Sequence, residues 1–371
     1  MIKTMKTSTP RCRSIGFTLI ELMVGMAIGL LITLAIATVL INAENQRRTT
    51  TSGSDAQING GLAIYTIERQ LKMAGYGIVT DVTTTGCTFT IQSGGSAIAG
   101  APPVLAPVLI TAGAVGTSDT VRILSSSKRN FAMSVPVKAP LYDPNQTASA
   151  QDTTFMVKSA LGVAAGDLLA LVYNAPDTTC EGFQATSIPA VDTVKRDANS
   201  WNASKFPTKA ANATSYLVNL GTLVDLTYSV TADQRLRQSS FSLATQTATT
   251  QDLQSNVVIM KALYGKDTTG SGVIDTYDAV TPTTSALWRQ VRAVRVVVLA
   301  RSSQYEKDEV TTTLPQWDVG SGLTVPAATG VTACGTSQCI PLKVDSDSNW
   351  KHYRYKVFEL LVPLRNQIWN S

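Results

Sequence analysis

The stretch Gly16-Phe17-Thr18-Leu19-Ile20-Glu21 is followed directly by twenty uncharged residues, 22–41. At about 1.5 Å of rise per residue, a helix over that run is about 30 Å long, which is the thickness of a bilayer's hydrocarbon core. Glu21 lies at the entrance to the run, where a carboxylate is costly and therefore a functional candidate. The sequence predicts a membrane-spanning helix with one acidic residue at its start.

The residues before the apolar run do not form an ordinary secretory signal. They include no acid and four basic residues, Lys3, Lys6, Arg11 and Arg13. A secretory signal has its small-residue cleavage site after the apolar region, whereas Gly16 precedes it here. Cleavage after Gly16 would remove the charged leader, residues 1–16, and leave the helix on the mature protein. A signal anchor that keeps its leader is the alternative, but it explains neither Gly16 nor Glu21.

The string GFTLIELMVGMAIGLL closely resembles the class III signal of type IV prepilins and pseudopilins. In that family a membrane peptidase cuts after the glycine and methylates the new N-terminal phenylalanine. The resemblance implies that Gly16 is the cleavage residue and Phe17 the methylated N-terminus. It further implies that Glu21 takes part in helix assembly and that the prepilin peptidase is a partner.

Composition and charge restrict what the rest of the chain does. The chain has 371 residues, of which 44% are hydrophobic and 15% charged, as expected for a packed β-rich body. Its formal net charge of +5 falls to +1 without the four basic residues of the leader. A basic nucleic-acid footprint is therefore not supported. The positive charges before the apolar run outnumber Arg47 and Arg48 after it, which favours a cytoplasmic N-terminus in the inner membrane and a periplasmic body.

Four cysteines remain in the mature chain, and disulfides persist in the periplasm. Cys334 and Cys339 are close enough in sequence to close a local loop, which leaves Cys87 and Cys180 as the second pair. Four cysteines allow three pairings. A zinc site is the alternative, but the chain has no CxxC spacing and only one histidine, His352.

The expected fold is α+β and type IV pilin-like, with a helical spine followed by a β-rich body. We expect the helix over 17–75, its membrane-spanning part over 17–41, and the body over 76–371. Ile64, Ile67, Leu71 and Ala74 recur at helical spacing, and Gly75 is a C-cap candidate. Residues 49–53 and Gly60-Gly61 are poor helix formers, so continuity there stays open.

In the body, short apolar runs predict strands, and two long segments rich in Gly, Ala, Pro and Ser predict loops over 93–107 and 311–335. The predicted strands are 120–124, 154–157, 168–172, 216–218, 223–230, 257–263, 291–301 and 356–362.

Several strings in the mature chain look like the PilW family of minor pilins. They are KMAGYG, GDLLALVY, KALYGKDTTGSGVIDTYD, WRQVRAVRVVVLAR and FELLVPLRN, in that order. The resemblance implies a minor pilin that helps to start or cap a type IV pilus at its tip. It also implies partners: other minor and major pilins, the inner-membrane assembly platform and a large tip adhesin. A minor pseudopilin of a type II secretion system shares this plan and is the alternative.

Motifs for catalysis are missing from the sequence. It has no GxSxG nucleophile elbow and no GxxxxGK[ST] phosphate loop, so we do not expect an enzyme. His352 lies in an aromatic and basic cluster, 350–355, which could stack on single-stranded DNA. Strand residues alternating between core and surface explain this cluster better.

The segment 267–278 has the spacing of a calcium loop, which places oxygen ligands at alternate residues and closes with an acid. The expected ligands are Asp267, Thr269, Ser271, the Val273 carbonyl, Asp275 and Asp278. Without a cation these crowded acids should repel one another. The flanking segments are a strand and a loop, not the paired helices of an EF-hand, so an ordinary polar turn is the alternative.

Overall fold

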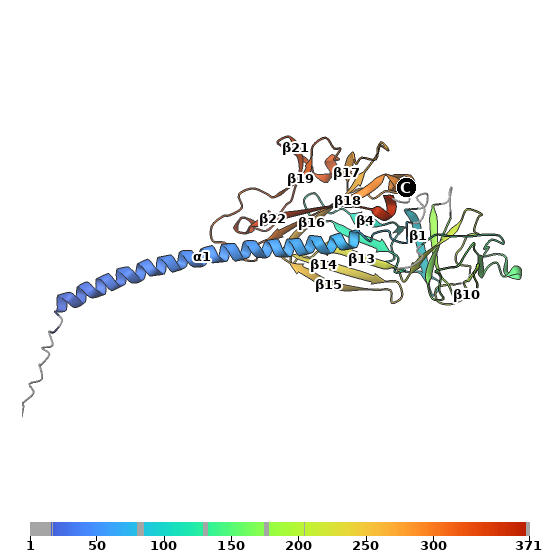
Figure 1. Ribbon diagram of the computed structural model, residues 1–371, viewed down its shortest axis with the longest axis horizontal. Coiled ribbons are helices and arrows are strands. Elements are labelled where there is room, and N and C mark those ends of the chain that lie inside the picture. The colour runs from blue at the N-terminus through green and yellow to red at the C-terminus, as the bar shows by residue number, and fades with distance from the viewer. Residues whose placement is uncertain are drawn as a thin grey trace, which may run out of the picture. The chain divides into compact units, whose positions relative to one another are not determined.

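The computed structural model describes residues 16, 18–79, 85–128, 133–173, 178–203 and 205–368, without the side chains of 45 and 48–52 (Figure 1). The chain forms two compact units, Met1–Ser52 and Gly53–Ser371, and each is described by itself. The division falls inside the first helix, so the second half of that helix belongs to the body.

Helix α1, Leu19–Leu71, is a single helix of 53 residues. The helix continues through residues 49–53 and Gly60-Gly61, whose low helix propensity leaves its continuity undecided from the sequence alone. In the first unit, all described side chains from Leu19 to Ile41 are exposed. Leu19–Glu44 is long and apolar enough to cross a membrane, with a mean hydropathy of 2.6. A helix that is apolar on every side is stable in lipid and not in water.

In the second unit, α1 supplies one wall of the main core. Ile67, Leu71 and Ala74 are fully buried, as their helical spacing predicted, and Ile64 packs at the edge of the same cluster. Gly60 shows why a poor helix former is present, because a Cβ there would overlap the Phe358 ring. Past the helix, Gly75 adopts a φ of 75° and its N–H donates to the carbonyl of Leu124 at 2.8 Å. The helix therefore ends against the sheet that it packs on.

Two antiparallel sheets hold this half of α1, and their strands lie on both sides of it in Figure 1. The first has the order β15-β14-β13-β5-β4 and the second the order β17-β16-β18-β22. We call these two sheets, with α1 from Gly53, the helix-binding part. The strands are β4 (Val108–Thr111), β5 (Thr120–Ser125), β13 (Val224–Val230), β14 (Arg235–Ser242), β15 (Thr247–Ser255), β16 (Val257–Lys266), β17 (Thr276–Asp278), β18 (Val291–Arg301) and β22 (Tyr355–Pro363).

A seven-stranded sheet and a three-stranded sheet form a second region, which we call the disulfide lobe. The larger sheet has the order β2-β1-β9-β8-β12-β6, with β3 paired to β1, and the smaller one the order β10-β11-β7. Its strands are β1 (Cys87–Ser93), β2 (Ser96–Ala97), β3 (Val104–Leu105), β6 (Val135–Pro136), β7 (Thr154–Met156), β8 (Leu168–Val172), β9 (Thr179–Gln184), β10 (Ser187–Ala190), β11 (Thr193–Lys195) and β12 (Tyr216–Gly221). Apolar clusters fill both faces of the larger sheet.

A small sheet, β19-β21-β20, covers the outer face of β16 and β18. Its strands are β19 (Gln316–Gly320), β20 (Thr332–Cys334) and β21 (Ser337–Pro341). Two short helices, α2 (Ser285–Gln290) and α3 (Arg365–Ile368), flank β18, and three 3-10 turns complete the described elements: η1 (Thr147–Ser149), η2 (Ala327–Thr329) and η3 (Trp350–His352).

Each predicted strand has a counterpart, and the runs 168–172 and 291–301 match β8 and β18 to the residue. The two predicted loops were wrong in part. The first contains β2 and β3, and the second contains β19 and β20. These strands are short and pair locally, so they need no apolar run of their own.

Candidate functional site

The first turn of α1 forms a reciprocal cap between Thr18 and Glu21. The Glu21 carboxylate accepts from the Thr18 backbone N–H and from its hydroxyl, both at 3.0 Å, through Oε2. In return, the Glu21 N–H donates to the Thr18 hydroxyl oxygen at 3.3 Å. This is the capping-box arrangement, which satisfies helix N–H groups that have no partner inside the helix.

The cap gives Glu21 a local role beside the assembly role implied by its place in the signal. The Thr-x-x-Glu spacing was readable in the sequence and was missed, because the carboxylate was considered only as a charge next to lipid. Gly16 lies just before this turn and has open space around its Cα. Phe17 and the leader before Gly16 lie outside the described residues.

Both predicted disulfides form. Cys87 on β1 and Cys180 on β9 are joined across the parallel pair of strands, with Cα atoms 5.8 Å apart. Cys334 and Cys339 are joined across the β20–β21 hairpin, with Cα atoms 5.7 Å apart. Asp318 lies near the second pair, but both thiols of that group are used in the disulfide.

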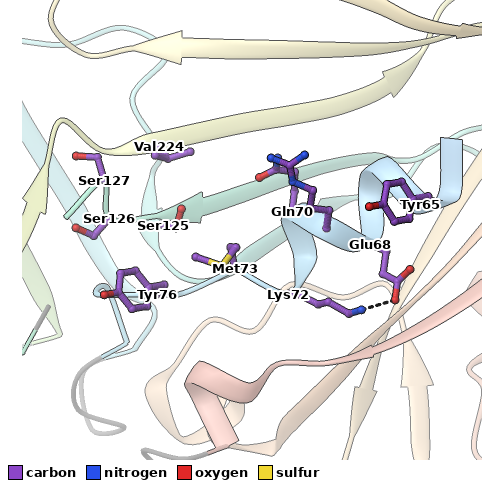
Figure 2. Close-up of a pocket in the computed structure, with 11 residues that line it drawn as sticks. Tyr65, Glu68, Gln70, Lys72, Met73, Tyr76, Ser125, Ser126, Ser127 and Val224 are labelled. Carbon is purple, nitrogen blue, oxygen red and sulfur yellow. Dashed lines mark ion pairs between the residues drawn. The ribbon is translucent and has the colours of Figure 1, made fainter. Parts of the chain in front are cut away.

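A groove of about 840 Å³ runs beside the end of α1, opposite the ends of β5 and β13 (Figure 2). Tyr65, Met73 and Tyr76 supply its apolar side chains, while Glu68 and Lys72 form an ion pair at its rim at 2.6 Å. Arg69 also lines the groove, and its side chain makes no hydrogen bond or ion pair with another described residue. Ser125, Ser126 and Ser127 line its opposite side, and its lining residues include no histidine or cysteine.

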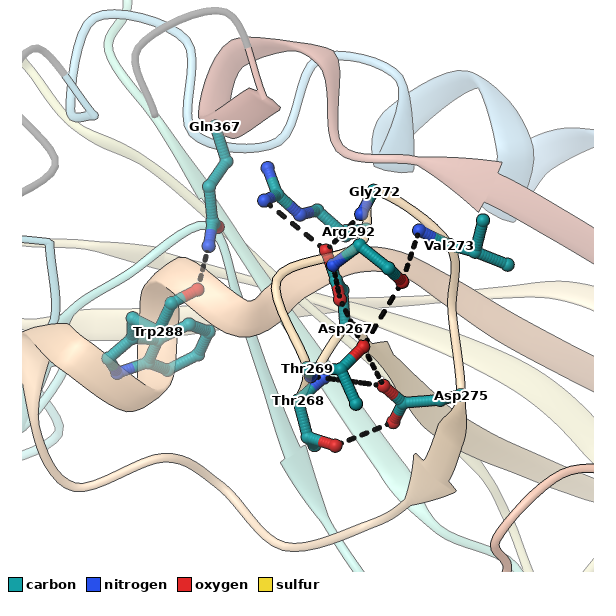
Figure 3. A network of polar contacts seen from close by, with 10 residues as sticks. Asp267, Thr268, Thr269, Gly272, Val273, Asp275, Trp288, Arg292 and Gln367 are labelled. Atoms are coloured by element: carbon teal, nitrogen blue, oxygen red, sulfur yellow. Dashed lines mark hydrogen bonds and ion pairs between the residues drawn. The ribbon is translucent and has the colours of Figure 1, made fainter.

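The predicted calcium loop is closed by hydrogen bonds around two acids (Figure 3). Asp267 is buried, and its carboxylate accepts from the N–H groups of Ser271 at 3.0 Å and Gly272 at 2.8 Å. Arg292 lies 3.6 Å away. Burial raises the pKa of Asp267, but these amides and Arg292 outweigh it and hold the pKa below its usual range.

Asp275 ties the other side of the loop. Its carboxylate accepts from the hydroxyls of Thr276 at 2.7 Å and Thr268 at 2.8 Å, and from the Thr268 N–H at 2.9 Å. The two hydroxyl bonds are the main reason that the pKa of Asp275 falls to about 2. The Thr269 hydroxyl lies 3.4 Å from Asp267 and 3.3 Å from Asp275, so it links the two acids.

The structure corrects the ligand set at Asp278. Its two oxygens accept from the Lys266 ammonium at 2.6 and 2.8 Å, because β17 pairs with β16 and turns Asp278 back toward that strand. Each acid of the segment has donors of its own, which offset the repulsion expected among them. Asp267, Thr269, Ser271 and Asp275 lie together, linked by the Thr269 hydroxyl. The Val273 N–H donates to the Ser271 hydroxyl at 3.4 Å. Calcium binding stays a prediction for these four residues and the Val273 carbonyl.

Aromatic stacking and ion pairs hold the cluster around His352 together. The imidazole stacks on Tyr305 with ring centroids 4.6 Å apart, and its Nδ1 lies 2.9 Å from the carbonyl of Glu306. Arg354 is paired with the Glu306 carboxylate at 2.7 Å. Lys351 is paired in the same way with the Glu309 carboxylate at 3.3 Å, so both Lys351 and Arg354 have acidic partners.

Two family models match the chain. The prokaryotic N-terminal methylation motif matches residues 11–41, which include the cleavage residue, the cap and the apolar helix. The model for type IV pilus-assembly protein W, PilW, matches residues 226–366, which run from β13 to α3. The two matches support a type IV prepilin-like protein of the PilW family.

Both matches fit the α+β, pilin-like fold described above. Together they point to a membrane-anchored, structural protein that works with other components of a pilus. The PilW match covers most of the helix-binding part and none of the strands in the disulfide lobe. No curated protein and no solved structure matches the chain.

Proposed function

We propose that this PilW-family protein is a minor pilin that helps to start or cap a type IV pilus at its tip. In this proposal the leader is removed after Gly16 and Phe17 is methylated. The body then lies in the periplasm before assembly and at the cell surface afterwards. The supporting observation is the presence of a prepilin N-terminus and a pilus-assembly body in one chain.

The helix is suited to two environments in succession. Its apolar side chains between Leu19 and Ile41 are exposed on every side, so lipid or other pilin helices can cover them. Glu21 is the one acid in that segment, and its cap satisfies part of its hydrogen-bonding capacity without a second subunit. The negative charge of the Glu21 carboxylate can form an ion pair with the new α-amino group of Phe17, on the same chain or on a neighbouring subunit.

Three variants test the N-terminus in a strain that lacks the chromosomal copy. Gly16→Leu should leave the full-length, leader-bearing form in the membrane, since the peptidase must approach the backbone closely.

Glu21→Gln keeps a capping side chain but removes the charge, whereas Glu21→Val removes both. We expect processed, inserted protein and few surface pili with either Glu21 variant. Pilus numbers restored by Glu21→Gln alone would assign the residue to capping rather than to charge pairing.

Mass spectrometry and pilus counts provide the decisive readouts. A mature N-terminus other than methylated Phe17 would contradict the prepilin part of the proposal. Deleting the gene should reduce surface pili and twitching, while secretion of folded exoproteins continues. Lost secretion with normal pili would favour the type II pseudopilus instead.

A further inference from the structure

The edges of the sheets differ in how well they are protected. An edge strand presents unpaired N–H and C=O groups, and proteins usually protect it by short length, charge, proline or cover. Among the described sheets, most edge strands have at most five residues. Only two edge strands have nine residues, β15 and β22.

The two long edges differ in sequence. Strand β22 includes Pro363 and exposes the charged side chains of Lys356 and Glu359. Strand β15 reads TATTQDLQS, with no proline and one charge, Asp252. That charge is already neutralised by Arg237 on β14, with Nε and Oδ1 2.6 Å apart. Strand β15 is therefore long, nearly neutral and unprotected.

The register shows which backbone groups of β15 point outward. The β13–β14 turn closes with the Thr231 N–H donating to the Arg235 carbonyl at 2.9 Å. Hydrogen-bonded and non-bonded pairs alternate along an antiparallel ladder. Counting from the bonded pair Thr231–Arg235, every second residue of β14 bonds to β13. The residues between them, which include Gln238 and Ser240, direct their backbone groups toward β15. Their partners Gln251 and Thr249 therefore bond to β14. The residues between and beside them have outward backbone groups: Ala248, Thr250 and Asp252.

Those three residues form an open row on an exposed strand. All six residues from 247 to 252 are exposed. In the described part of the chain β15 has one neighbouring strand, β14, and no other strand bonds to the backbone of Ala248, Thr250 or Asp252. Five residues of strand span about 16 Å. An added strand can thus form several main-chain hydrogen bonds without displacing any existing one.

We propose that β15 is an acceptor edge to which another subunit of the pilus adds a β-strand. This rests on the proposed function, because it names the contact by which the chain joins its assembly. The partner strand is an extended segment with an open edge of its own, rich in β-branched residues. Opposite Asp252 it carries a neutral or basic residue, because like charges directly opposite each other destabilise a strand pair.

A second copy of this chain fits the edge less well. Two β15 strands of identical chains would pair antiparallel about a two-fold axis. Strands β13–β15 run along α1 rather than across it in Figure 1. The 53–71 helices of the two copies would then enter the pair from opposite ends, whereas chains anchored in one membrane enter from the same side.

A proline at position 250 tests the proposal with a matched control. Thr250→Pro removes an outward N–H and leaves the ladder to β14 intact, which is where edge strands tolerate proline. Thr250→Ala changes the side chain and keeps the N–H. We expect Thr250→Pro to reach wild-type amounts in the membrane with an unchanged melting curve, yet to give at least tenfold fewer surface pili. Thr250→Ala should behave like wild type.

Cross-linking tests the same edge without relying on the proline variant. p-Benzoylphenylalanine at position 250 of the full chain should cross-link in cells to a strand of another pilin subunit, identified by mass spectrometry. Cross-links to a second copy of the chain, or to no pilin, would overturn the proposal. So would normal piliation with Thr250→Pro in a strain where gene deletion abolishes pili. If deletion itself leaves pili unchanged, the proposed function fails instead.

Discussion

The disulfide lobe and the helix-binding part are stabilised in different ways. In the lobe, Cys87–Cys180 joins strands from segments 93 residues apart. In the helix-binding part the corresponding links are buried ion pairs, Lys261–Asp119 at 2.7 Å and Lys266–Asp278 at 2.6 Å. The PilW match covers most of the second region and stops short of the first. The family model thus covers most strands of the two sheets that pack on the helix, but not α1, β4 or β5.

The two regions should therefore lose stability through different substitutions. A covalent link restricts the unfolded chain and is insensitive to pH, whereas a buried ion pair stabilises only while both partners are present and charged. Loss of the disulfide should therefore loosen the lobe alone, and loss of an ion pair should weaken the region that contains α1.

The largest effect is expected from Cys87→Ser with Cys180→Ser. The chain-entropy model gives about 4–5 kcal/mol for closing a loop of this length, against about 2 kcal/mol for the short Cys334–Cys339 loop. We expect a separate, earlier unfolding transition of the lobe, measured by denaturant titration of the purified full chain in detergent. The matched double variant of Cys334 and Cys339 should lose only about 2 kcal/mol and show no separate transition of the lobe. Equal losses from the two pairs would contradict the comparison.

Asp278→Ala should have the next largest effect. It leaves the Lys266 ammonium nearly buried without its partner, which costs about 3 kcal/mol by analogy with other buried pairs. Replacing both residues, Lys266→Met with Asp278→Leu, removes the unpaired charge and should recover much of the loss. The free energy of unfolding distinguishes the two cases. A double variant as unstable as Asp278→Ala would show that the pair contributes more than mutual neutralisation.

The paired acids also show what the sequence could and could not predict. The Cys334–Cys339 disulfide was predictable from its short spacing, and Cys87–Cys180 followed as the remaining pair. The strands 168–172 and 291–301 were predictable because runs rich in Leu and Val specify them. The partner of Asp278 was not, because it depends on the pairing of β17 with β16. Strand β15 was missed for a related reason. Its polar residues show no apolar alternation, and its pairing with β14 makes it a strand.

A smaller effect is expected from pH, through Asp275. Its pKa falls from 3.8 to about 2 in the folded protein, so the folded state binds its proton less readily than the unfolded state. The resulting stability is complete above about pH 4 and is lost as pH falls toward about 2. Asp275→Asn lacks this contribution and should melt a few degrees lower at neutral pH. The difference from wild type should shrink between those two pH values. A difference that stays constant down to pH 2 would exclude this role.

The smallest effect concerns calcium. If Asp267, Thr269, Ser271 and Asp275 bind the ion, millimolar calcium should raise the melting temperature slightly, because binding to the folded form stabilises it and extracellular sites are often weak. Asp275→Asn should abolish the rise. The lobe variant without Cys87–Cys180 should keep it, since the loop belongs to the other region. Identical melting curves of the unmutated protein with calcium and with chelator would show that the segment is a polar turn that does not bind calcium.

The fit of α1 into its two sheets also has a mechanical consequence. Ala63, Ile67 and Leu71 are buried in one row along the helix, and Ala74 is buried in the turn that follows it. Asn366 holds this turn, because its side-chain N–H donates to the Ala74 carbonyl at 2.9 Å. A tensile force along the helix axis must therefore shear all four side chains past the sheets together instead of peeling them away singly. Contacts loaded in parallel share the force, so this part of the body is suited to remain folded while its helix is pulled.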